Sequence, residues 1–475
     1  MELNILYLND VHGYLEPHDE LFYNNKGEFT ETVGGYSRIS TLVKQIRENN
    51  NPTLLFDGGD TFHGTLPVVD SRGEAIIPVL NKLSFNAMVG HWDFAYGPQQ
   101  LKHLLSKLNY PMLGINVYKE DGSLFLQPFI TFQIENLKIG VIGVCSNIID
   151  KTMPAQFSEG LKITDGIAEL PAYIEQLKND QVDIIILLSH NGFPQDMHLL
   201  QKVDGIDICL SAHTHNRLYK PELVNKTIVI QCGCHGSFLG HLKLNIENKQ
   251  ITGHEYNLLK VTEDISPDAE MEKIIDDILQ AYQTKKKNVM GSTEKTLHRY
   301  DTMNSSMDNL LLRAVMYVSD TKISFSNGWR YGAPIRSGKI TEDDLYNIIP
   351  MNPPVSTVDL SGQEIIDMLE ENLERTFSAE PMKQMGGYVK RCGGLRINLR
   401  IENPPGHRIQ EIYFDGKHLD PKKVFKVSFV TSQGVPKNMG KNRKEMDIKA
   451  VEAMTEFLKV HPKFDVNDDN LFALV

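Results

Sequence analysis

The stretch LYLNDVHG, Leu6–Gly13, decides the fold of this 475-residue chain. An apolar run ends here, and the polar residues Asp10 and His12 follow it. Four later apolar runs end in the same residue types: LLFDGGDTF (54–62), AMVGHWD (87–93), IILLSHNG (185–192) and ICLSAHTHN (208–216). Ligands of open α/β sheets bind outside the carboxyl ends of the strands. We therefore expect the Asp and His side chains of all five segments to converge on one site.

The sequence around these segments predicts an α/β fold. Short apolar runs alternate with helical patterns through residues 1–260, which is typical of a layered α/β domain. The expected strands are 4–9, 52–56, 85–89, 110–117, 138–144, 182–189, 205–211 and 227–231, and the expected helices are 35–50, 97–108 and 166–180. Beyond these the pattern changes, and we predict a first domain at 1–262, a linker helix at 263–289 and an α+β second domain at 290–475.

Composition narrows the class of protein. The net charge of −12 excludes the basic surface typical of nucleic-acid binding, and no apolar run reaches the length of a membrane span. The first residues, MELNILYLND, lack the basic region and apolar stretch of a secretory signal, so we expect a cytoplasmic location. The five cysteines are scattered, unlike a disulfide framework. Cys232, Cys234 and His235 form either a weak metal signal or small residues closing a strand. The oligomeric state stays open.

The polar residues at the strand ends have the chemistry of metal ligands. His and carboxylate ligands suit Zn, Mn, Fe, Ni or Co better than Mg alone. In D-x-H and H-x-H, alternate residues of an extended segment point to the same side. A single histidine after a strand is usually an ordinary loop residue, but five such segments in order favour a site for two metals that share a carboxylate. Asp57 is expected to hydrogen-bond its own loop or to support a ligand.

The order D-x-H, G-D, His190 and H-x-H resembles the metallophosphoesterase superfamily, and more closely its two-domain 5′-nucleotidase branch. The segments SNGWRYG (326–332) and LSGQEIIDMLEENLE (360–374) are similar to the C-terminal substrate domain of that branch. The resemblance implies an α/β fold, in which a β-sandwich flanked by helices forms the N-terminal metallophosphoesterase domain. An α+β substrate domain would follow it.

The resemblance also implies roles for individual residues. The first metal would be held by Asp10, His12, Asp60 and His215, with Asp60 bridging to the second. The second metal would be completed by His91, His190 and His213. Asp60, His91 and Arg330 would be the catalytic residues, with the guanidinium of Arg330 on the anionic group of the substrate. The cofactors would be two divalent ions, Mn²⁺ first, with Zn, Fe, Ni or Co as alternatives.

The stretch VGHWDFAYG, Val89–Gly97, departs from the nucleotidase pattern G-N-H-E-F-D-Y-G. His91 replaces a metal-binding Asn, Trp92 replaces the catalytic His, and Ala95 replaces the Asp that orients it. The late G-G-D-G-Y/F motif is also missing, because the corresponding region reads VSFVTSQGVPKNMGKNRKEMD (427–447). Both departures are similar to the sulfate thiohydrolases of the bacterial sulfur-oxidation (Sox) system, whose pattern is G-H-W-E-F-T-Y-G. Their dimanganese site hydrolyses a cysteine-bound thiosulfonate on a partner protein.

The loss of the His–Asp dyad bears on the leaving group. In a two-metal site a hydroxide attacks the phosphorus or sulfur in line. A sugar alkoxide leaves poorly without a general acid, since its conjugate acid has a pKa near that of water, about 15.7, whereas a thiol has a pKa of about 8.5. The sequence therefore favours a sulfur or otherwise activated leaving group. Trp92 would form a hydrophobic wall or line the substrate pocket.

Two alternatives remain open. The chain could be a 5′-nucleotidase or general phosphomonoesterase in which His63 or Asp93 substitutes as the acid, or a metal-binding protein without catalysis. The expected partner is a small anionic molecule, namely a phosphate ester, a nucleotide or a thiosulfonate. Neither nucleic acid nor a membrane is expected as a partner.

Overall fold

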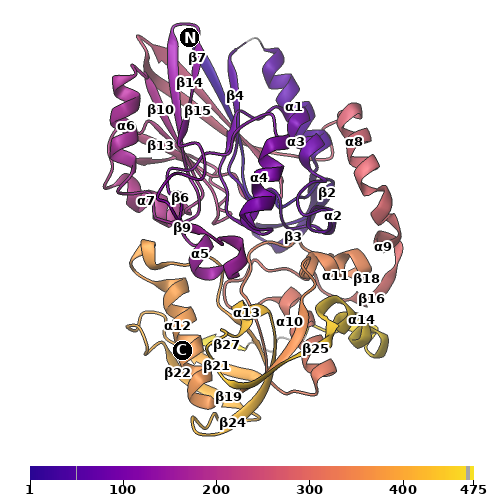
Figure 1. Cartoon of the computed structure of the whole chain (residues 1–475). Helices are drawn as coiled ribbons and strands as arrows, with labels where there is room; N and C mark the ends of the chain where they lie inside the picture. Colours follow the sequence, from indigo (N-terminus) through magenta and orange to yellow (C-terminus); the bar gives the residue numbers. More distant parts are fainter. Residues whose placement is uncertain (50, 467–470) are drawn as a thin grey trace. The chain divides into compact units, whose positions relative to one another are not determined.

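The computed structural model describes residues 1–49, 51–466 and 471–475 (Figure 1). They divide into two compact units: residues 1–18 with 32–280, and residues 19–31 with 281–475. Asn50, at the end of a predicted helix, and residues 467–470 of the predicted second domain lie outside the described residues. The predicted linker segment 263–289 contains α8 (Ala269–Leu279), a 3-10 turn (Gln280–Tyr282) and α9 (Gln283–Lys287) in place of one helix. The domain limits proposed from sequence stay predictions.

Two sheets form the centre of the first unit. One has the strand order β15-β14-β1-β4-β5, and the other has the order β12-β13-β11-β10-β8-β7. The first comprises β1 (Glu2–Leu8), β4 (Thr53–Asp57), β5 (Ala87–Met88), β14 (Phe238–Glu247) and β15 (Gln250–Lys260). The second comprises β7 (Phe129–Ile134), β8 (Leu137–Val144), β10 (Ile184–Ser189), β11 (Ile208–Ser211), β12 (Glu222–Val224) and β13 (Thr227–Ile230). Within them β1 pairs with β4, and β10 with β8 and β11, in parallel.

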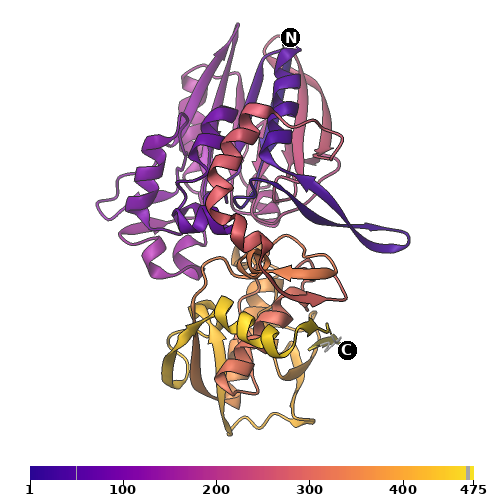
Figure 2. The ribbon, with the colours of Figure 1, turned by 90° about the vertical axis from the view of Figure 1, so that its right-hand side faces the viewer.

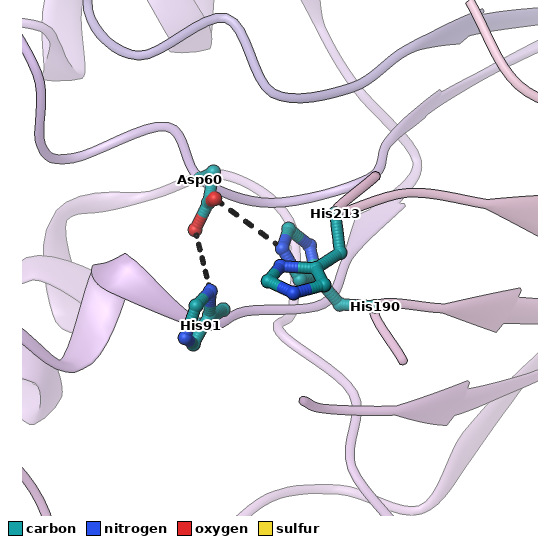
Figure 3. A group of neighbouring side chains, drawn as sticks. All are labelled: Asp60, His91, His190 and His213. Atoms are coloured by element: carbon teal, nitrogen blue, oxygen red, sulfur yellow. Dashed lines mark ion pairs between the residues drawn. The ribbon is translucent and has the colours of Figure 1, made fainter. Parts of the chain in front are cut away.

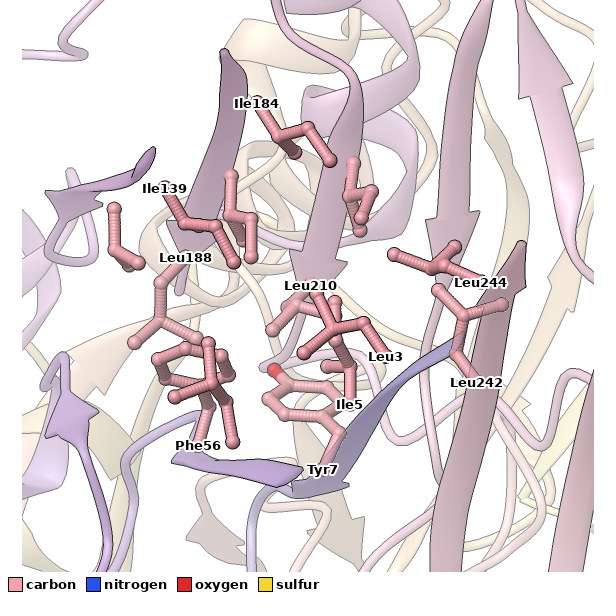
Figure 4. Close-up of a cluster of buried hydrophobic side chains, with 14 of the residues drawn as sticks. Leu3, Ile5, Tyr7, Phe56, Ile139, Ile184, Leu188, Leu210, Leu242 and Leu244 are labelled. Carbon is pink, nitrogen blue, oxygen red and sulfur yellow. The ribbon is translucent and has the colours of Figure 1, made fainter. Parts of the chain in front are cut away.

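The two sheets pack face to face around one apolar core (Figure 4). Alternate residues of β1, Leu3, Ile5 and Tyr7, meet residues such as Leu188 and Leu210 of the second sheet, as the two-residue period of a strand requires. The β-sandwich predicted for the N-terminal domain is confirmed.

Helices flank this sandwich. On the outer face of the second sheet, α6 (Leu170–Asn179) and α7 (Phe193–Leu200) bury Ile174, Leu177 and Leu199 against the strands. Near the first sheet, α1 (Tyr36–Glu48), α3 (Ile77–Leu83) and α8 pack against one another, and Lys44 reaches the Asp268 cap of α8 at 2.6 Å. The remaining elements of this unit are α2 (Leu66–Asp70), the turn at Trp92–Phe94, α4 (Pro98–Lys107), β6 (Val117–Lys119), α5 (Ile149–Thr152), the turn at Ala155–Phe157 and β9 (Leu161–Ile163).

Most of the predicted elements of the first unit are present. Helices 35–50, 97–108 and 166–180 correspond to α1, α4 and α6, and six of the eight predicted strands correspond to β1, β4, β8, β10, β11 and β13. The prediction of a strand at 110–117 was wrong, because only isolated bridges at Met112 and Leu113 precede β6. Of the strand predicted at 85–89, only Ala87–Met88 is extended.

The second unit is α+β (Figure 2). A five-stranded sheet has the order β20-β17-β24-β19-β25, beside smaller sheets of order β18-β16-β26 and β23-β22-β21-β27. The strands of these three sheets are β16 (Val289–Thr293), β17 (Ser324–Ser326), β18 (Gly338–Thr341), β19 (Pro354–Ser361), β20 (Arg391–Gly393), β21 (Leu395–Leu399), β22 (Ile409–Phe414), β23 (Lys417–His418), β24 (Val424–Val430), β25 (Lys441–Lys449), β26 (Lys463–Phe464) and β27 (Phe472–Leu474). The hairpin strands β2 (Pro17–Asn24) and β3 (Gly27–Gly34) lie largely in this unit.

Helices and short turns complete the second unit. They are α10 (Ser306–Ser319), α11 (Glu342–Ile348), α12 (Gly362–Phe377), the turn at Pro381–Lys383, α13 (Thr431–Gly434) and α14 (Ala450–Val460). Ser361 and Glu364 form a capping box at the start of α12, whose apolar face joins the main core with Val427 and Ile397. None of the helices described in either unit is long and apolar enough to cross a membrane.

Candidate metal centre

Seven polar side chains meet at the carboxyl ends of the strands of the first unit. They follow β1, β4, β5, β10 and β11, so both sheets contribute. They form two groups, and within each group one nitrogen or oxygen atom of every residue lies within 4.8 Å of those of the others. The first group is Asp10, His12, Asp60 and His215, and the second is Asp60, His91, His190 and His213. The structure thus brings together all seven residues that the sequence suggested as metal ligands, and Figure 3 shows the second group.

In the first group, histidine nitrogens face carboxylate oxygens. His12 Nε2 lies 3.4 Å from Asp60 Oδ2, and His215 Nε2 lies 3.4 Å from Asp10 Oδ1. The two histidine Nε2 atoms are 3.3 Å apart. Four donors therefore surround one point, as a single divalent cation requires.

The second group shares Asp60 with the first. His91 Nδ1 lies 3.5 Å from Asp60 Oδ1, and His190 Nε2 lies 3.4 Å from Asp60 Oδ2 (Figure 3). His190 Nε2 is also 3.7 Å from Asp10 Oδ1. Since the two oxygens of Asp60 serve both groups, this carboxylate has the geometry of a bridge between two sites.

The histidine rings are oriented by backbone carbonyl groups. His190 Nδ1 lies 2.5 Å from the carbonyl oxygen of Gly58, and His12 Nδ1 lies 3.0 Å from that of His63. A ring that donates its Nδ1–H to a carbonyl presents an unprotonated Nε2 to a metal. Both histidines therefore point the nitrogen that a metal would use towards Asp60.

Burial and charge shift the pKa values of this cluster in opposite directions. Burial lowers the pKa of His12 to about 3, so this ring is neutral. Burial also acts to lower the pKa of His190, but Asp60 and Asp10 outweigh it and raise that pKa to about 10. Without a metal this ring therefore also carries a proton on Nε2, which a bound metal would displace. Although burial works against it, the surrounding histidines hold the pKa of Asp60 well below its usual range. Asp60 is thus ionised, as a bridging ligand must be.

The donor set fits two divalent ions. Three buried ring nitrogens have no hydrogen-bond partner among the described residues. They are Nδ1 and Nε2 of His91 and Nε2 of His190. Buried polar atoms are ordinarily satisfied, and an imidazole nitrogen that faces a carboxylate is a typical ligand of Mn, Zn or Fe. The residues present therefore match a dinuclear centre.

The backbone at this site is strained. Five of the seven ligands have a positive φ between 52° and 74°: Asp10, His12, Asp60, His213 and His215. Such left-handed conformations are uncommon outside glycine and cost on the order of 1–3 kcal/mol each. Gly59, with φ of 86°, allows a close approach of two ligand loops, because a Cβ there would lie 2.5 Å from the carbonyl oxygen of Val89.

The comparisons with known proteins agree with this geometry. Residues 3–217 match the calcineurin-like phosphoesterase family, and residues 281–432 match the C-terminal domain of 5′-nucleotidases. The chain belongs to the two-domain 5′-nucleotidase family. It is therefore a metallophosphoesterase-type hydrolase, as the sequence predicted.

Three similar proteins place this 5′-nucleotidase-family hydrolase among its relatives. The trifunctional nucleotide phosphoesterase protein YfkN of Bacillus subtilis is 23% identical over 472 residues, which cover 88% of this chain and 30% of that protein. The chain thus spans less than a third of YfkN. The sulfate thiohydrolase SoxB of Thermus thermophilus, solved with glycerol, superposes with a TM-score of 0.92 at 22% identity, covering 100% of this chain and 96% of that one. A 5′-nucleotidase precursor, also from Thermus thermophilus, superposes with a TM-score of 0.89 at 20% identity, covering 100% and 99%.

Trp92 and His63 stack beside the centre of this hydrolase. Their ring centroids are 4.5 Å apart with an interplanar angle of 26°, and Phe157 packs edge-on against the indole at 6.0 Å. The backbone N–H of Trp92 donates to Asp60 Oδ1 at 2.7 Å. Burial lowers the pKa of His63 to about 3. The position where the nucleotidase pattern has its catalytic histidine is therefore held by a buried aromatic pair.

Asp93 anchors the two loops that carry Asp60 and His91. Its Oδ1 accepts hydrogen bonds from the backbone N–H groups of Thr61 and Phe62, and its Oδ2 accepts from those of Asp60 and His91, all at 2.9–3.1 Å. Burial raises the pKa of Asp93. Both oxygens are thus used in holding the loops together, which argues against Asp93 as a substitute acid.

Asp57 has the loop role that the sequence favoured. It accepts from Thr61 Oγ1 at 2.8 Å and from the backbone N–H of Gly59 at 2.9 Å. Burial, with the nearby charge of Asp93, raises the pKa of Asp57 to about 7. Its contacts are with the loop.

Arg330 belongs to the second unit. Its Nη2 donates to the carbonyl oxygen of Gly387 at 3.0 Å, and its guanidinium lies 5.2 Å from the ring centroid of Tyr388. Gly387 and Tyr388 both belong to the same unit as Arg330. The role of Arg330 on the substrate stays a prediction.

Sequence reasoning missed two buried polar residues close to the segments that carry the candidate ligands. Asn9 donates to Asp10 Oδ2 at 2.6 Å and to the carbonyl oxygen of Gly233 at 2.8 Å. The other is Asp196, buried on α7. The polar Asn9 in an otherwise apolar run was a usable signal, whereas Asp196 lies in a helix with no motif around it. The C-x-C segment contributes no cysteine to either ligand group of the first unit.

Proposed function

We propose that this chain is a two-metal hydrolase for a small anionic substrate with a good leaving group, a thiol first of all. The observation that carries the proposal is the stacked pair of Trp92 and His63, with Ala95 in place of the orienting aspartate. A thiosulfonate or a thiophosphate ester releases sulfur of low basicity, so neither requires a protonated residue at that position.

The ligands named above would hold two divalent ions, and we propose Mn²⁺ as the native metal. Bound there, the ions would supply a water of lowered pKa and charge to hold the anionic group under attack. The protein itself contributes orientation, because Asp93 fixes the loops of Asp60 and His91 against each other. Trp92 and Phe157 present aromatic surface that excludes water on one side of the centre.

The runner-up is a 5′-nucleotidase or general phosphomonoesterase with a substitute acid. It is supported by the match to the 5′-nucleotidase C-terminal domain and by the likeness to a 5′-nucleotidase precursor. The likeness to a sulfate thiohydrolase supports the first proposal to the same extent, because both likenesses concern the fold. The stacked pair of His63 and Trp92 supports the proposal of a good leaving group over the nucleotidase.

A substrate panel tests the proposal. The full chain is loaded with Mn²⁺ and assayed on AMP, p-nitrophenyl phosphate, an S-linked thiophosphate ester and a peptide carrying a cysteine S-thiosulfonate. We expect the highest kcat/KM on a sulfur-linked substrate and low turnover of AMP. AMP as the best substrate would refute the proposal and favour the nucleotidase. His91→Ala serves as the inactive control for every substrate.

A further inference from the structure

Asp196 connects two strands beneath the metal centre. It lies on α7 and is fully buried. Its Oδ1 accepts a hydrogen bond from Ser189 Oγ at 2.6 Å, and its Oδ2 accepts one from Ser211 Oγ at 2.6 Å. One carboxylate therefore joins two serine hydroxyl groups, each through its own oxygen.

The two serines occupy matching places in the sheet. Ser189 ends β10 and Ser211 ends β11, and they are direct partners in the parallel register of these strands. His190 follows the first serine directly, and His213 lies two residues beyond the second. Figure 3 shows these two imidazoles side by side in the second ligand group, with ring centroids 5.4 Å apart.

The serine hydroxyl groups have no freedom to bond elsewhere. Ser189 Oγ also accepts from the backbone N–H of Asn191 at 3.3 Å, and Ser211 Oγ accepts from Gln231 Nε2 at 3.2 Å. Each hydroxyl has a single proton, which is directed to Asp196. Without this carboxylate, two buried hydroxyl protons would lose their acceptor, which is costly in the interior.

We infer that Asp196 is a positioning residue, which sets the spacing between His190 and His213 and so the affinity of the second ligand group for its metal. The inference rests on the proposed metal centre. Removal of a group that orients metal ligands without binding the metal itself typically lowers metal affinity by about 10–100-fold. The first group takes no ligand from β10 and takes only His215 from the segment after β11. Its affinity should change less.

The same two strands offer a matched control at their other ends. Asp207 Oδ2 accepts from the backbone N–H of Ile185 at 2.8 Å, which joins the amino ends of β10 and β11. Asp207→Ala removes a carboxylate bridge between the same strands but at the end away from the histidines. A loss of general stability should thus appear in both variants, and a loss of positioning only in Asp196→Ala.

Mn²⁺ titration of the metal-free full chain tests the inference, by calorimetry and by electron paramagnetic resonance of the bound Mn²⁺. Wild type should bind two equivalents, and His190→Ala identifies the equivalent held by the second group. Asp196→Ala should weaken that equivalent by about 10–100-fold and reduce the signal of the coupled Mn²⁺ pair, with the other equivalent within about threefold. Asp207→Ala should leave both equivalents unchanged.

Two further variants keep the test decisive. If Asp196→Ala does not fold, the pair Ser189→Ala and Ser211→Ala removes the donors and should weaken the same equivalent. Asp196→Asn retains one acceptor oxygen and should lie between wild type and Asp196→Ala. Unchanged binding of both equivalents in a folded Asp196→Ala would overturn the inference alone. A wild type that binds fewer than two Mn²⁺ would overturn the metal centre and the inference together.

Discussion

The imidazole of His63 stacks on the indole of Trp92, with ring centroids 4.5 Å apart and an interplanar angle of 26°, and the backbone N–H of Trp92 donates to the carboxylate of Asp60. Stacked aromatic pairs of this kind are stabilised by dispersion and by exclusion of water. Under the proposed function, the stacked ring of His63 forms a wall of the site and does not act as the proton donor. The pair thereby separates this chain from enzymes that keep a His–Asp dyad at the same place.

Restoring the dyad should widen the substrate range. We expect Trp92→His with Ala95→Asp to raise kcat/KM for AMP by at least about tenfold, because general acids contribute about 10²–10⁴-fold to departure of a poor leaving group. The kcat/KM for p-nitrophenyl phosphate, with its weakly basic leaving group, should change much less. Trp92→Phe is the control, since it keeps an aromatic ring and adds no proton donor. Equal changes in both variants would show that the leaving group needs no acid here.

Removal of one second-group ligand should be visible in the metal content. We expect His91→Ala to bind one equivalent of Mn²⁺ in place of two and to lose hydrolase activity, because one of the four donors of that group is gone. Metal analysis after dialysis measures the stoichiometry. His103→Ala is the matched control, since His103 is half-exposed on α4 and contacts Glu74. Two equivalents in His91→Ala would remove His91 from the ligand set.

Asp93, which holds the two ligand loops together, should contribute to the free energy of unfolding even when no metal is bound. Asp93→Asn keeps the shape of the side chain but turns an amide N–H₂ towards backbone N–H donors. We expect a loss of about 2–4 kcal/mol in the free energy of unfolding, since bonds to a charged acceptor contribute about 1.5–3 kcal/mol each and the buried donors stay unpaired. Urea unfolding in EDTA measures it. The exposed Asp264→Asn should fall within about 0.5 kcal/mol of wild type.

The second unit should become more stable as the pH rises above 8. Burial lowers the pKa of Lys390 to about 8 from its usual 10.5, and its Nζ donates to the carbonyl oxygen of Gly434 at 3.0 Å. Between these two values the unfolded chain binds more protons than the folded one, so the free energy of unfolding increases by up to about 1.4 kcal/mol per pH unit. Unfolding of wild type and Lys390→Met from pH 7 to 10.5 measures the difference. Parallel curves for the two proteins would contradict this expectation.

The sequence predicted most of the central strands of the first unit because their signals are local. Buried strands such as β8 and β10 are continuous apolar runs, and the ligands directly follow strand ends, where sheet topology dictates convergence. The strands β14 and β15 were both missed. β15 consists of half-buried and exposed residues and gives no buried apolar run, whereas β14 is mostly buried but has His241 and Lys243 among its apolar residues. The prediction of a strand at 110–117 was wrong because an apolar run is not always a strand. Its apolar residues are buried in a loop that forms only single bridges.

The supporting residues of the site could not be read from the sequence. Asp196 contacts Ser189 and Ser211, which lie 7 and 15 residues away in the chain, and the register of β10 against β11 places the two serines side by side. Asp93 was weighed as a ligand or an acid, because one carboxylate near a metal motif is indistinguishable from another until its hydrogen bonds are known. Roles set by long-range pairing are the ones that sequence patterns leave undetermined.

The left-handed backbone of five metal ligands has an evolutionary consequence. At Asp10, His12, Asp60, His213 and His215, selection for stability alone would favour glycine or asparagine, which adopt such conformations at lower cost. Only a benefit from the bound ions offsets this disadvantage. In a lineage that stopped using the metals, drift should therefore erode the D-x-H and H-x-H positions sooner than the surrounding core.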